Sequence, residues 1–140
     1  ANPPGLAEDA KRMDAVASDN DLRYSIDCPK DAQAAEICTV DKPTYFGWRT
    51  YHAHCFQCHG GSAMGSTFAP SLLDRFDQGV DLERFEYVVQ NGFTGQTGVM
   101  PKFDKNKQVT KNLSNLYLYI RARADGALPP GRPKRESKSN

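Results

Sequence analysis

The sequence lacks several features that would place it in a common protein class. None of its 140 residues form the run of roughly 18 apolar positions that a membrane-spanning helix needs, so we expect no membrane span. The formal net charge of +1 gives no indication of nucleic-acid binding. No internal repeat is present. An apolar content of 39% indicates a modest hydrophobic core, which usually requires reinforcement.

Histidine is scarce as well, and all three histidines lie with two of the four cysteines in the segment YHAHCFQCHG, residues 51–60. Three kinds of site fit such a segment: structural zinc, a redox dithiol, or a haem attachment site. Zinc is disfavoured because His52 and His54, two positions apart on an expected helix, point in different directions. Cys28 and Cys38 are ten residues apart and do not form a zinc knuckle. A redox dithiol needs a βαβ context, which the pattern does not indicate.

The C-x-x-C-H pattern of Cys55, Cys58 and His59 is the signature of c-type haem attachment. Two thiols on one turn can reach the two vinyl groups of a porphyrin edge, and the adjacent imidazole lies below the iron. Met100, 41 residues after His59, is our candidate for the sixth ligand, because it follows a glycine-rich loop and precedes a proline. Met64 is too close to His59 to reach the opposite face. A core methionine is the alternative role for Met100.

Other residues near this motif have expected supporting roles. Pro70, in FAPSL, is placed to offer its carbonyl to the second ring nitrogen of His59, although an ordinary turn proline would look the same. His52 and His54 are expected to be half-exposed helix residues or neighbours of the haem propionates.

The hydrophobic periodicity predicts an all-α fold. We expect a weak helix within residues 6–18, a helix capped by Thr44 that runs to Cys55, a short turn after Pro70, a helix from Asp81 to Asn91–Gly92, and a last helix from Thr110 to Gly126. The loops between them are too long for a self-sufficient bundle, so something else must fill the middle.

Taken together, these motifs and the flanking helices resemble the class I cytochromes c across residues 43–126. The resemblance rests on Cys55-x-x-Cys58-His59, Pro70 and Met100-Pro101. It implies helices wrapped around one covalent haem c, with an N-terminal extension over residues 1–42 and a basic, proline-rich tail over residues 127–140. It also implies that the first and last helices cross at a small residue and an aromatic, which correspond to Gly47 and Tyr117.

Three segments, TYFGWRTYHAHCFQCHG, MGSTFAPSLL and YLYIRARADGALPPGRP, resemble more narrowly the periplasmic cytochromes of methylotrophs. That group includes the cytochrome c-L proteins and their lanthanide-system relatives, which accept electrons from pyrroloquinoline quinone (PQQ) methanol or alcohol dehydrogenases. The resemblance implies an exported, periplasmic, monomeric electron carrier, not an enzyme, whose signal peptide has been removed. Its acceptor would be a downstream cytochrome c or oxidase. No Asp-rich loop in the sequence supports a calcium site.

Three other functions stay open at this point. The first is a general shuttle to a terminal oxidase, without a dedicated dehydrogenase. The second is a haem enzyme or sensor with an open sixth position. The third is a module without haem, in which the C-x-x-C-H match is accidental.

Cys28 and Cys38 are left over from the motif. In a compartment that permits haem attachment, we expect them to form a disulfide that pins the extension near the domain, with two free thiols as the alternative. Closing this short loop would stabilise the fold by about 2.5–3 kcal/mol on the chain-entropy model.

Overall fold

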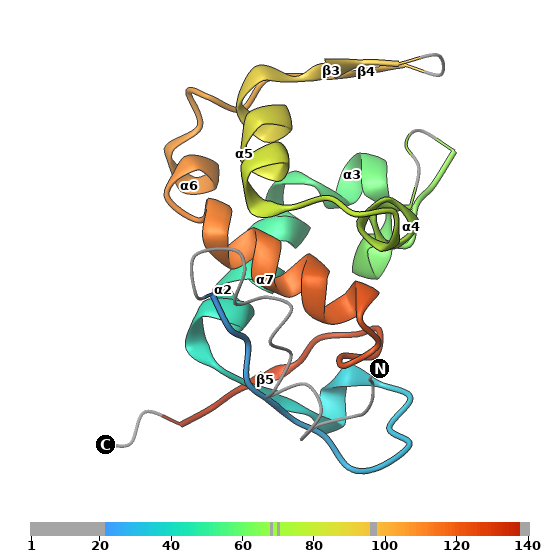
Figure 1. Ribbon diagram of the computed structural model, residues 1–140. Coiled ribbons are helices and arrows are strands. Elements are labelled where there is room, and N and C mark those ends of the chain that lie inside the picture. Colours follow the sequence, from blue (N-terminus) through green and yellow to red (C-terminus); the bar gives the residue numbers. More distant parts are fainter. Residues whose placement is uncertain (1–21, 68, 70, 96–97, 138–140) are drawn as a thin grey trace.

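The computed structural model describes residues 22–67, 69, 71–95 and 98–137, and it is mainly helical, as predicted (Figure 1). The described helices are α2 (Lys42–His54), α3 (Phe56–His59), α4 (Leu72–Asp77), α5 (Leu82–Asn91), α6 (Lys107–Thr110) and α7 (Leu113–Ala124), with 3-10 turns η2 (Ala35–Ile37) and η3 (Gly61–Ala63). Five two-residue strands accompany them: β1 (Ile26–Asp27), β2 (Thr39–Val40), β3 (Phe93–Thr94), β4 (Val99–Met100) and β5 (Lys134–Arg135). None of the described helices is both long and apolar enough to cross a membrane. The helix expected within residues 6–18 lies outside the described residues.

Helices α2 and α7 cross at the centre of the molecule, where they approach unusually closely at Gly47. A Cβ atom at this position would lie 1.9 Å from the Asn115 carbonyl oxygen and 3.0 Å from Cβ of Tyr119. The predicted crossing at Gly47 is therefore correct, but its aromatic partner is Tyr119 rather than Tyr117. Two helical positions are about 200° apart. Tyr117 consequently lies on another face of α7, with its ring centroid 5.4 Å from that of Phe76.

The middle helices follow local capping signals closely. The Asp81 side chain accepts a hydrogen bond from the Arg84 backbone nitrogen at 2.9 Å, and α5 ends at Gly92, whose φ is 80°. Ser71 caps α4 by accepting from the Leu73 backbone nitrogen at 3.1 Å. The predicted helix from Asp81 and the short helix after residue 70 are both confirmed.

The first and last of the described helices begin at different residues from those predicted. α2 starts at Lys42, with Asp41 at the N-cap position and a proline in its first turn, so Thr44 is buried inside the helix. Proline is well tolerated there because its missing N–H would be unpaired anyway. Thr110 ends the separate short helix α6, and α7 begins only after Asn112.

The N-terminal extension and the C-terminal tail meet in a small sheet of order β1-β2-β5. β1 pairs with β2 antiparallel, with Ile26 opposite Val40, and β2 pairs with β5 in parallel. A disulfide joins Cys28 to Cys38 in the connection between β1 and β2. Ile26 and Val40 are fully buried, whereas both residues of β5 are exposed, so this part of the tail joins the extension through backbone pairing.

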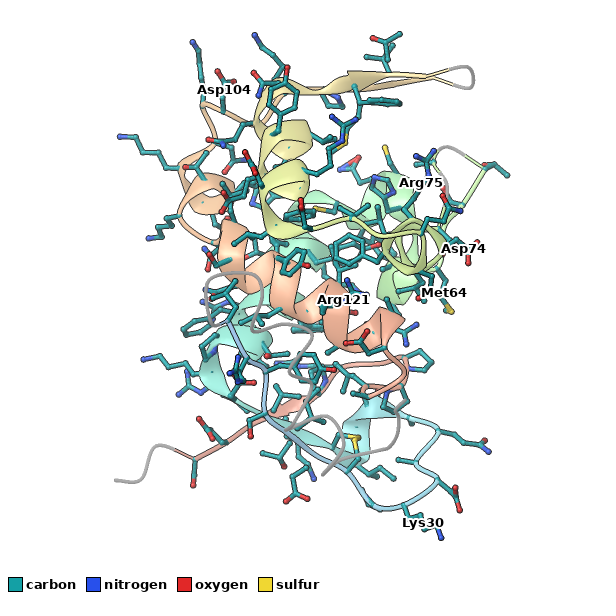
Figure 2. All side chains as sticks on the ribbon, viewed as in Figure 1. Lys30, Met64, Asp74, Arg75, Asp104 and Arg121 are labelled. Atoms are coloured by element: carbon teal, nitrogen blue, oxygen red, sulfur yellow. A yellow bond between two sulfur atoms is a disulfide. The ribbon has the colours of Figure 1, made fainter. Side chains whose placement is uncertain are left out.

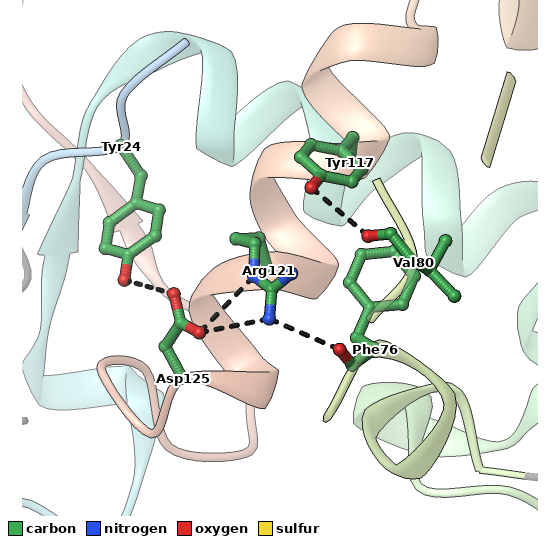
Figure 3. A network of polar contacts seen from close by, with 6 residues as sticks. All are labelled: Tyr24, Phe76, Val80, Tyr117, Arg121 and Asp125. Carbon is green, nitrogen blue, oxygen red and sulfur yellow. Dashed lines mark hydrogen bonds and ion pairs between the residues drawn. The ribbon is translucent and has the colours of Figure 1, made fainter. Parts of the chain in front are cut away.

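Figure 3 shows a polar network that fastens the extension to α7 and α7 to α4. The Tyr24 hydroxyl donates to Asp125 at 2.8 Å, and Arg121 forms an ion pair with the same carboxylate at 3.3 Å. Nη2 of Arg121 also donates to the Phe76 carbonyl at 3.5 Å. Burial, and then the Asp125 charge, raise the pKa of Tyr24 above its usual range. The hydroxyl therefore remains a donor.

We predict that Gly47→Ala destabilises the protein by about 2–3 kcal/mol, because the added methyl group forces the two central helices apart. The measurement is the free energy of unfolding in guanidinium chloride. Gly98→Ala is the matched control, since a Cβ at Gly98 meets no atom within 4 Å. Equal stability changes in the two variants would show that the close crossing does not limit the fold.

Candidate functional site

The C-x-x-C-H motif occupies the junction of α2 and α3. Cys55 follows the last residue of α2, and α3 carries Cys58 and His59 on its single turn. Both cysteines have free thiols, with Cys55 half-buried and Cys58 exposed. Burial, followed by the neighbouring Cys58, raises the pKa of the Cys55 thiol to about 12. The structure therefore brings two thiols and an imidazole together on adjacent turns of helix.

The loop after the motif is held by hydrogen bonds to the backbone of the motif itself. The Gly65 backbone nitrogen donates to the His59 carbonyl at 2.6 Å. The hydroxyl of Tyr51, one turn before Cys55 on α2, donates to the Gly60 carbonyl at 2.5 Å. Gly60 itself has a φ of 80°, which lets the chain turn sharply away from His59.

A buried arginine of α7 forms a hydrogen bond to this loop. Arg123 of α7 is only 7% exposed, and it donates to the carbonyls of Ser62 at 3.0 Å and of Leu128 at 2.8 Å. Ser62 in turn accepts the backbone N–H of Gly131 at 3.0 Å. Ser62 and Ala63 have φ values of 53° and 66°, a conformation that is strained for residues with a side chain. Arg123 thus holds a strained turn against the C-terminal segment.

Sequence reasoning missed the role of Arg123. Its position in the alternating RARAD segment gives no sign of burial, since neighbouring Arg121 on the same helix is half-exposed and paired with Asp125. Burial lowers the pKa of Arg123, while interactions with Tyr119 oppose that effect.

Met100 lies in a hairpin, away from the centre of the core. β4 pairs antiparallel with β3, which places Phe93 opposite Met100. Met100 is half-buried, whereas the preceding Val99 is 72% exposed. The backbone nitrogen of Phe103 donates to the Val89 carbonyl of α5 at 2.9 Å, and this bond anchors the end of the hairpin. Figure 1 shows the hairpin extending beyond α5. Pro70 lies outside the described residues.

The remaining histidines are engaged along α2 and with a neighbouring segment. Nδ1 of His52 lies 3.2 Å from the Trp48 carbonyl, and its ring lies between those of Trp48 and Phe56. Burial lowers the pKa of His52. Nε2 of His54 lies 2.7 Å from Oε1 of Gln108. Both are half-buried helix residues, and no group of three or more His, Cys, Asp or Glu side chains in the described segments could hold a metal ion.

Large apolar side chains are exposed on several segments between the motif and the β3–β4 hairpin. Five of the six exposed large apolar side chains in the described part of the chain lie between residues 56 and 99: Phe56, Met64, Tyr87, Phe93 and Val99. Figure 2 shows Met64 at the same edge of the molecule as Asp74 and Arg75 of α4. Exposed apolar area costs about 25 cal/mol per Å² relative to burial. Phe56 lies within the motif and Met64 in the loop that follows it, so the two thiols and the imidazole have exposed apolar neighbours, which fits a large apolar group such as a covalently bound haem.

Comparisons with known proteins agree with this chemistry. Residues 46–120 match the family described as cytochrome C oxidase, cbb3-type, subunit III. The chain is 41% identical to cytochrome c-553I of Paracoccus denitrificans over 113 residues, which cover 76% of this chain and 49% of that protein. It is 37% identical to cytochrome c-555 of Methylococcus capsulatus over 101 residues, which cover 71% of this chain and 78% of that protein.

A solved structure is similar as well. The c-type cytochrome XoxG from Methylobacterium extorquens AM1 superposes with a TM-score of 0.66 at 43% identity, covering 73% of this chain and 64% of that one. The chain spans about half the length of cytochrome c-553I and just under two thirds of XoxG.

We predict that Arg123→Gln destabilises the protein by about 2–4 kcal/mol, because it removes charge-assisted hydrogen bonds to two buried carbonyls. Arg121→Gln, two residues earlier on α7, is the matched control and should cost less, since its side chain is 17% exposed and its ion pair with Asp125 is partly screened by water. Guanidinium chloride unfolding measures both. Hydrogen exchange at the Gly65 amide, bonded to the His59 carbonyl, should accelerate in the Arg123 variant alone. Comparable losses in the two variants would contradict the assigned role.

Proposed function

Because this chain belongs to the class I c-type cytochromes, a family of electron-transfer proteins, we propose that it is a one-electron carrier built on a single covalent haem c. Its helices adopt the cytochrome c fold that the sequence predicted. The observation that carries the proposal is the turn between α2 and α3, where two free thiols and His59 follow one another beside exposed apolar side chains.

In this proposal Cys55 and Cys58 would hold the haem through two thioether links, and His59 and Met100 would ligate its iron. When bound, haem supplies reversible one-electron chemistry, and a Met ligand raises its reduction potential relative to a second His. The loop bonded to the His59 carbonyl restrains the backbone of that ligand, and the β3–β4 hairpin carries Met100. A carbonyl from Pro70 would fix the His59 ring.

We infer further that the electron donor is a PQQ-dependent methanol or alcohol dehydrogenase in the periplasm. The narrow resemblance of the segments around the motif and of YLYIRARADGALPPGRP supports this donor, and so does the 43% identity to XoxG. The Cys28–Cys38 disulfide is compatible with an oxidising compartment. A reduced quinone gives up two electrons and two protons, so each alcohol oxidised would reduce two carrier molecules. The electrons would then pass to a downstream cytochrome c or oxidase.

A second candidate is a general shuttle that delivers electrons to a terminal oxidase without a dedicated dehydrogenase. The match of residues 46–120 to the cbb3-type oxidase subunit III family favours it. The two candidates share the haem site and differ only in the donor.

The ligand assignment predicts a clear difference between two methionine variants. Met100→Ala should lose the weak sulfur-to-iron absorption band of the oxidised protein, lower the reduction potential and let the reduced protein bind carbon monoxide. Met64→Ala, at an exposed methionine close to the motif, should change none of these properties. Visible and near-infrared spectra with a redox titration measure them. Unaltered spectra in Met100→Ala, or the loss of the band in Met64→Ala, would reject Met100 as ligand.

The donor assignment predicts fast, saturable reduction of the oxidised protein by a substrate-reduced PQQ alcohol dehydrogenase. Anaerobic stopped-flow absorbance at the haem α-band measures the rate, with dithionite as the control reductant. A protein that dithionite reduces but the dehydrogenase does not is an electron carrier with another donor. A protein purified from a haem-attaching host without any α-band would contradict the carrier function itself.

A further inference from the structure

The outward face of α2 and the C-terminal tail together carry a cluster of cations stacked on aromatic rings. We call this surface the α2–tail face; it consists of Lys42, Phe46, Trp48, Arg49, Arg132 and Arg135. Three of its cations surround the Phe46 ring, with Nζ of Lys42 at 5.8 Å, the Arg49 guanidinium at 4.7 Å and the Arg135 guanidinium at 5.7 Å from its centroid. The fourth, Arg132, lies 5.2 Å from the Trp48 ring centroid.

The acids beside this cluster do not pair with its cations: Asp41 and Glu136 are the sequence neighbours of Lys42 and Arg135, and in the described part of the chain neither forms an ion pair with them. No Asp or Glu occurs in the sequence between Asp41 and Asp74, which spans all of α2 and the C-x-x-C-H motif. Within the described residues, no carboxylate forms an ion pair with a side chain of the four cations. Glu36 contacts Arg132 only through the backbone nitrogen, at 3.2 Å. The four cations outnumber Asp41, Glu36 and Glu136, and like charges without ion-pair partners repel one another, so the surface is complementary to an anionic partner.

The cations of the tail are held in place by ordered backbone. β5 lies beside β2, where the Lys134 nitrogen donates to the Cys38 carbonyl and the Glu136 nitrogen donates to the Val40 carbonyl, both at 2.9 Å. Nη2 of Arg132 also donates to the Tyr45 hydroxyl at 3.3 Å. A surface that is already ordered loses less conformational entropy when a partner binds.

The α2–tail face reaches the haem attachment turn. The rings of Trp48 and His52 on α2 and of Phe56 at the start of α3 follow one another, with centroids 4.9 and 5.6 Å apart. Phe56 lies between Cys55 and Cys58 in the sequence and is 48% exposed. Eight helical positions correspond to about 12 Å. A partner covering a typical patch of roughly 800 Å² on the basic end would therefore also cover this turn.

We propose that the α2–tail face is the docking surface for an acidic patch on the electron donor, the dehydrogenase of the proposed function on which this inference rests. Charge complementarity selects the partner, and Phe56 brings it close to the thioether links. Arg132 belongs to the ALPPGRP segment, which is also part of the narrow resemblance to dehydrogenase-coupled cytochromes. Docking forms no covalent bond, and one electron passes from the reduced donor to the oxidised carrier.

The test compares two triple variants that each remove three positive charges. Arg49→Gln/Arg132→Gln/Arg135→Gln alters the α2–tail face, and Lys102→Gln/Lys105→Gln/Lys107→Gln alters exposed lysines elsewhere. Stopped-flow measures the second-order rate constant for reduction by the substrate-reduced dehydrogenase at several salt concentrations. The arginine variant should lose at least about tenfold at low salt and show a shallower salt dependence, whereas the lysine variant should stay within about twofold of the wild type.

Two further measurements separate docking from folding and from redox chemistry. The reduction potential and the rate of reduction by dithionite should be unchanged in both variants. Arg49→Gln/Arg135→Gln keeps the contact of Arg132 with Tyr45 and should show a smaller loss of the same kind, even if the triple variant folds poorly.

The other possible outcomes contradict the inference, and they distinguish a wrong docking surface from a wrong electron donor. Equal losses in the two triple variants, a loss in the lysine variant alone, or no loss in either would place docking elsewhere while leaving the donor assignment intact. A wild-type protein that dithionite reduces but the dehydrogenase does not would reject the proposed donor, and with it a docking surface for that donor.

Discussion

The close contact of α2 with α7 at Gly47 is the constraint on which the rest of the structure depends. A missing side chain at one position lets the α2 backbone lie directly on the carbonyl of Asn115. α2 ends at the C-x-x-C-H motif, while α7 ends at the arginines and the aspartate that hold the loop and the extension. The crossing therefore fixes the distance between the motif and its supports. Helix packing normally sets axes 8–10 Å apart, and only glycine permits the nearest approach.

Beyond this crossing, the C-terminal half of α7 carries two arginines that form different kinds of polar interaction. Arg121 lies at the partly exposed edge of α7 and pairs with the Asp125 carboxylate, and water screens this pair more than it screens Arg123. Arg123 points inward and donates to the neutral carbonyls of Ser62 and Leu128. Burying a guanidinium destabilises a protein unless its N–H groups form hydrogen bonds. Here Arg123 bonds to the carbonyl of Ser62, in a turn whose backbone is itself strained. The loop after His59 is thus held in a conformation that its own residues would not adopt.

The sequence predicted those parts of the molecule that local chemistry decides. Asp81 and Gly92 delimit α5 because a cap and a left-handed glycine act within one turn, and the motif from Cys55 to His59 is likewise local. The sequence did not predict the choice of Tyr119 over Tyr117, because both are aromatic and only the helix phase distinguishes them. Strands of two residues carry no readable periodicity, so the sheet that joins Ile26, Val40 and the tail could not be foreseen. The burial of Arg123 likewise depends on carbonyls from distant segments.

In the C-terminal tail, backbone atoms form most of the hydrogen bonds to the rest of the protein, whereas the charged side chains face the surface. Its inner contacts are made largely by backbone atoms: the Leu128 carbonyl accepts from Arg123, the Gly131 nitrogen donates to Ser62, and β5 pairs with β2. The cationic side chains of this segment lie over ring faces on α2 or in solvent. Backbone hydrogen bonds do not depend on the charge of the side chains. Substitutions can therefore change the charge of this surface while the backbone conformation of the tail stays the same. A docking surface requires this independence, since its charge must match a partner without altering the loop that supports His59.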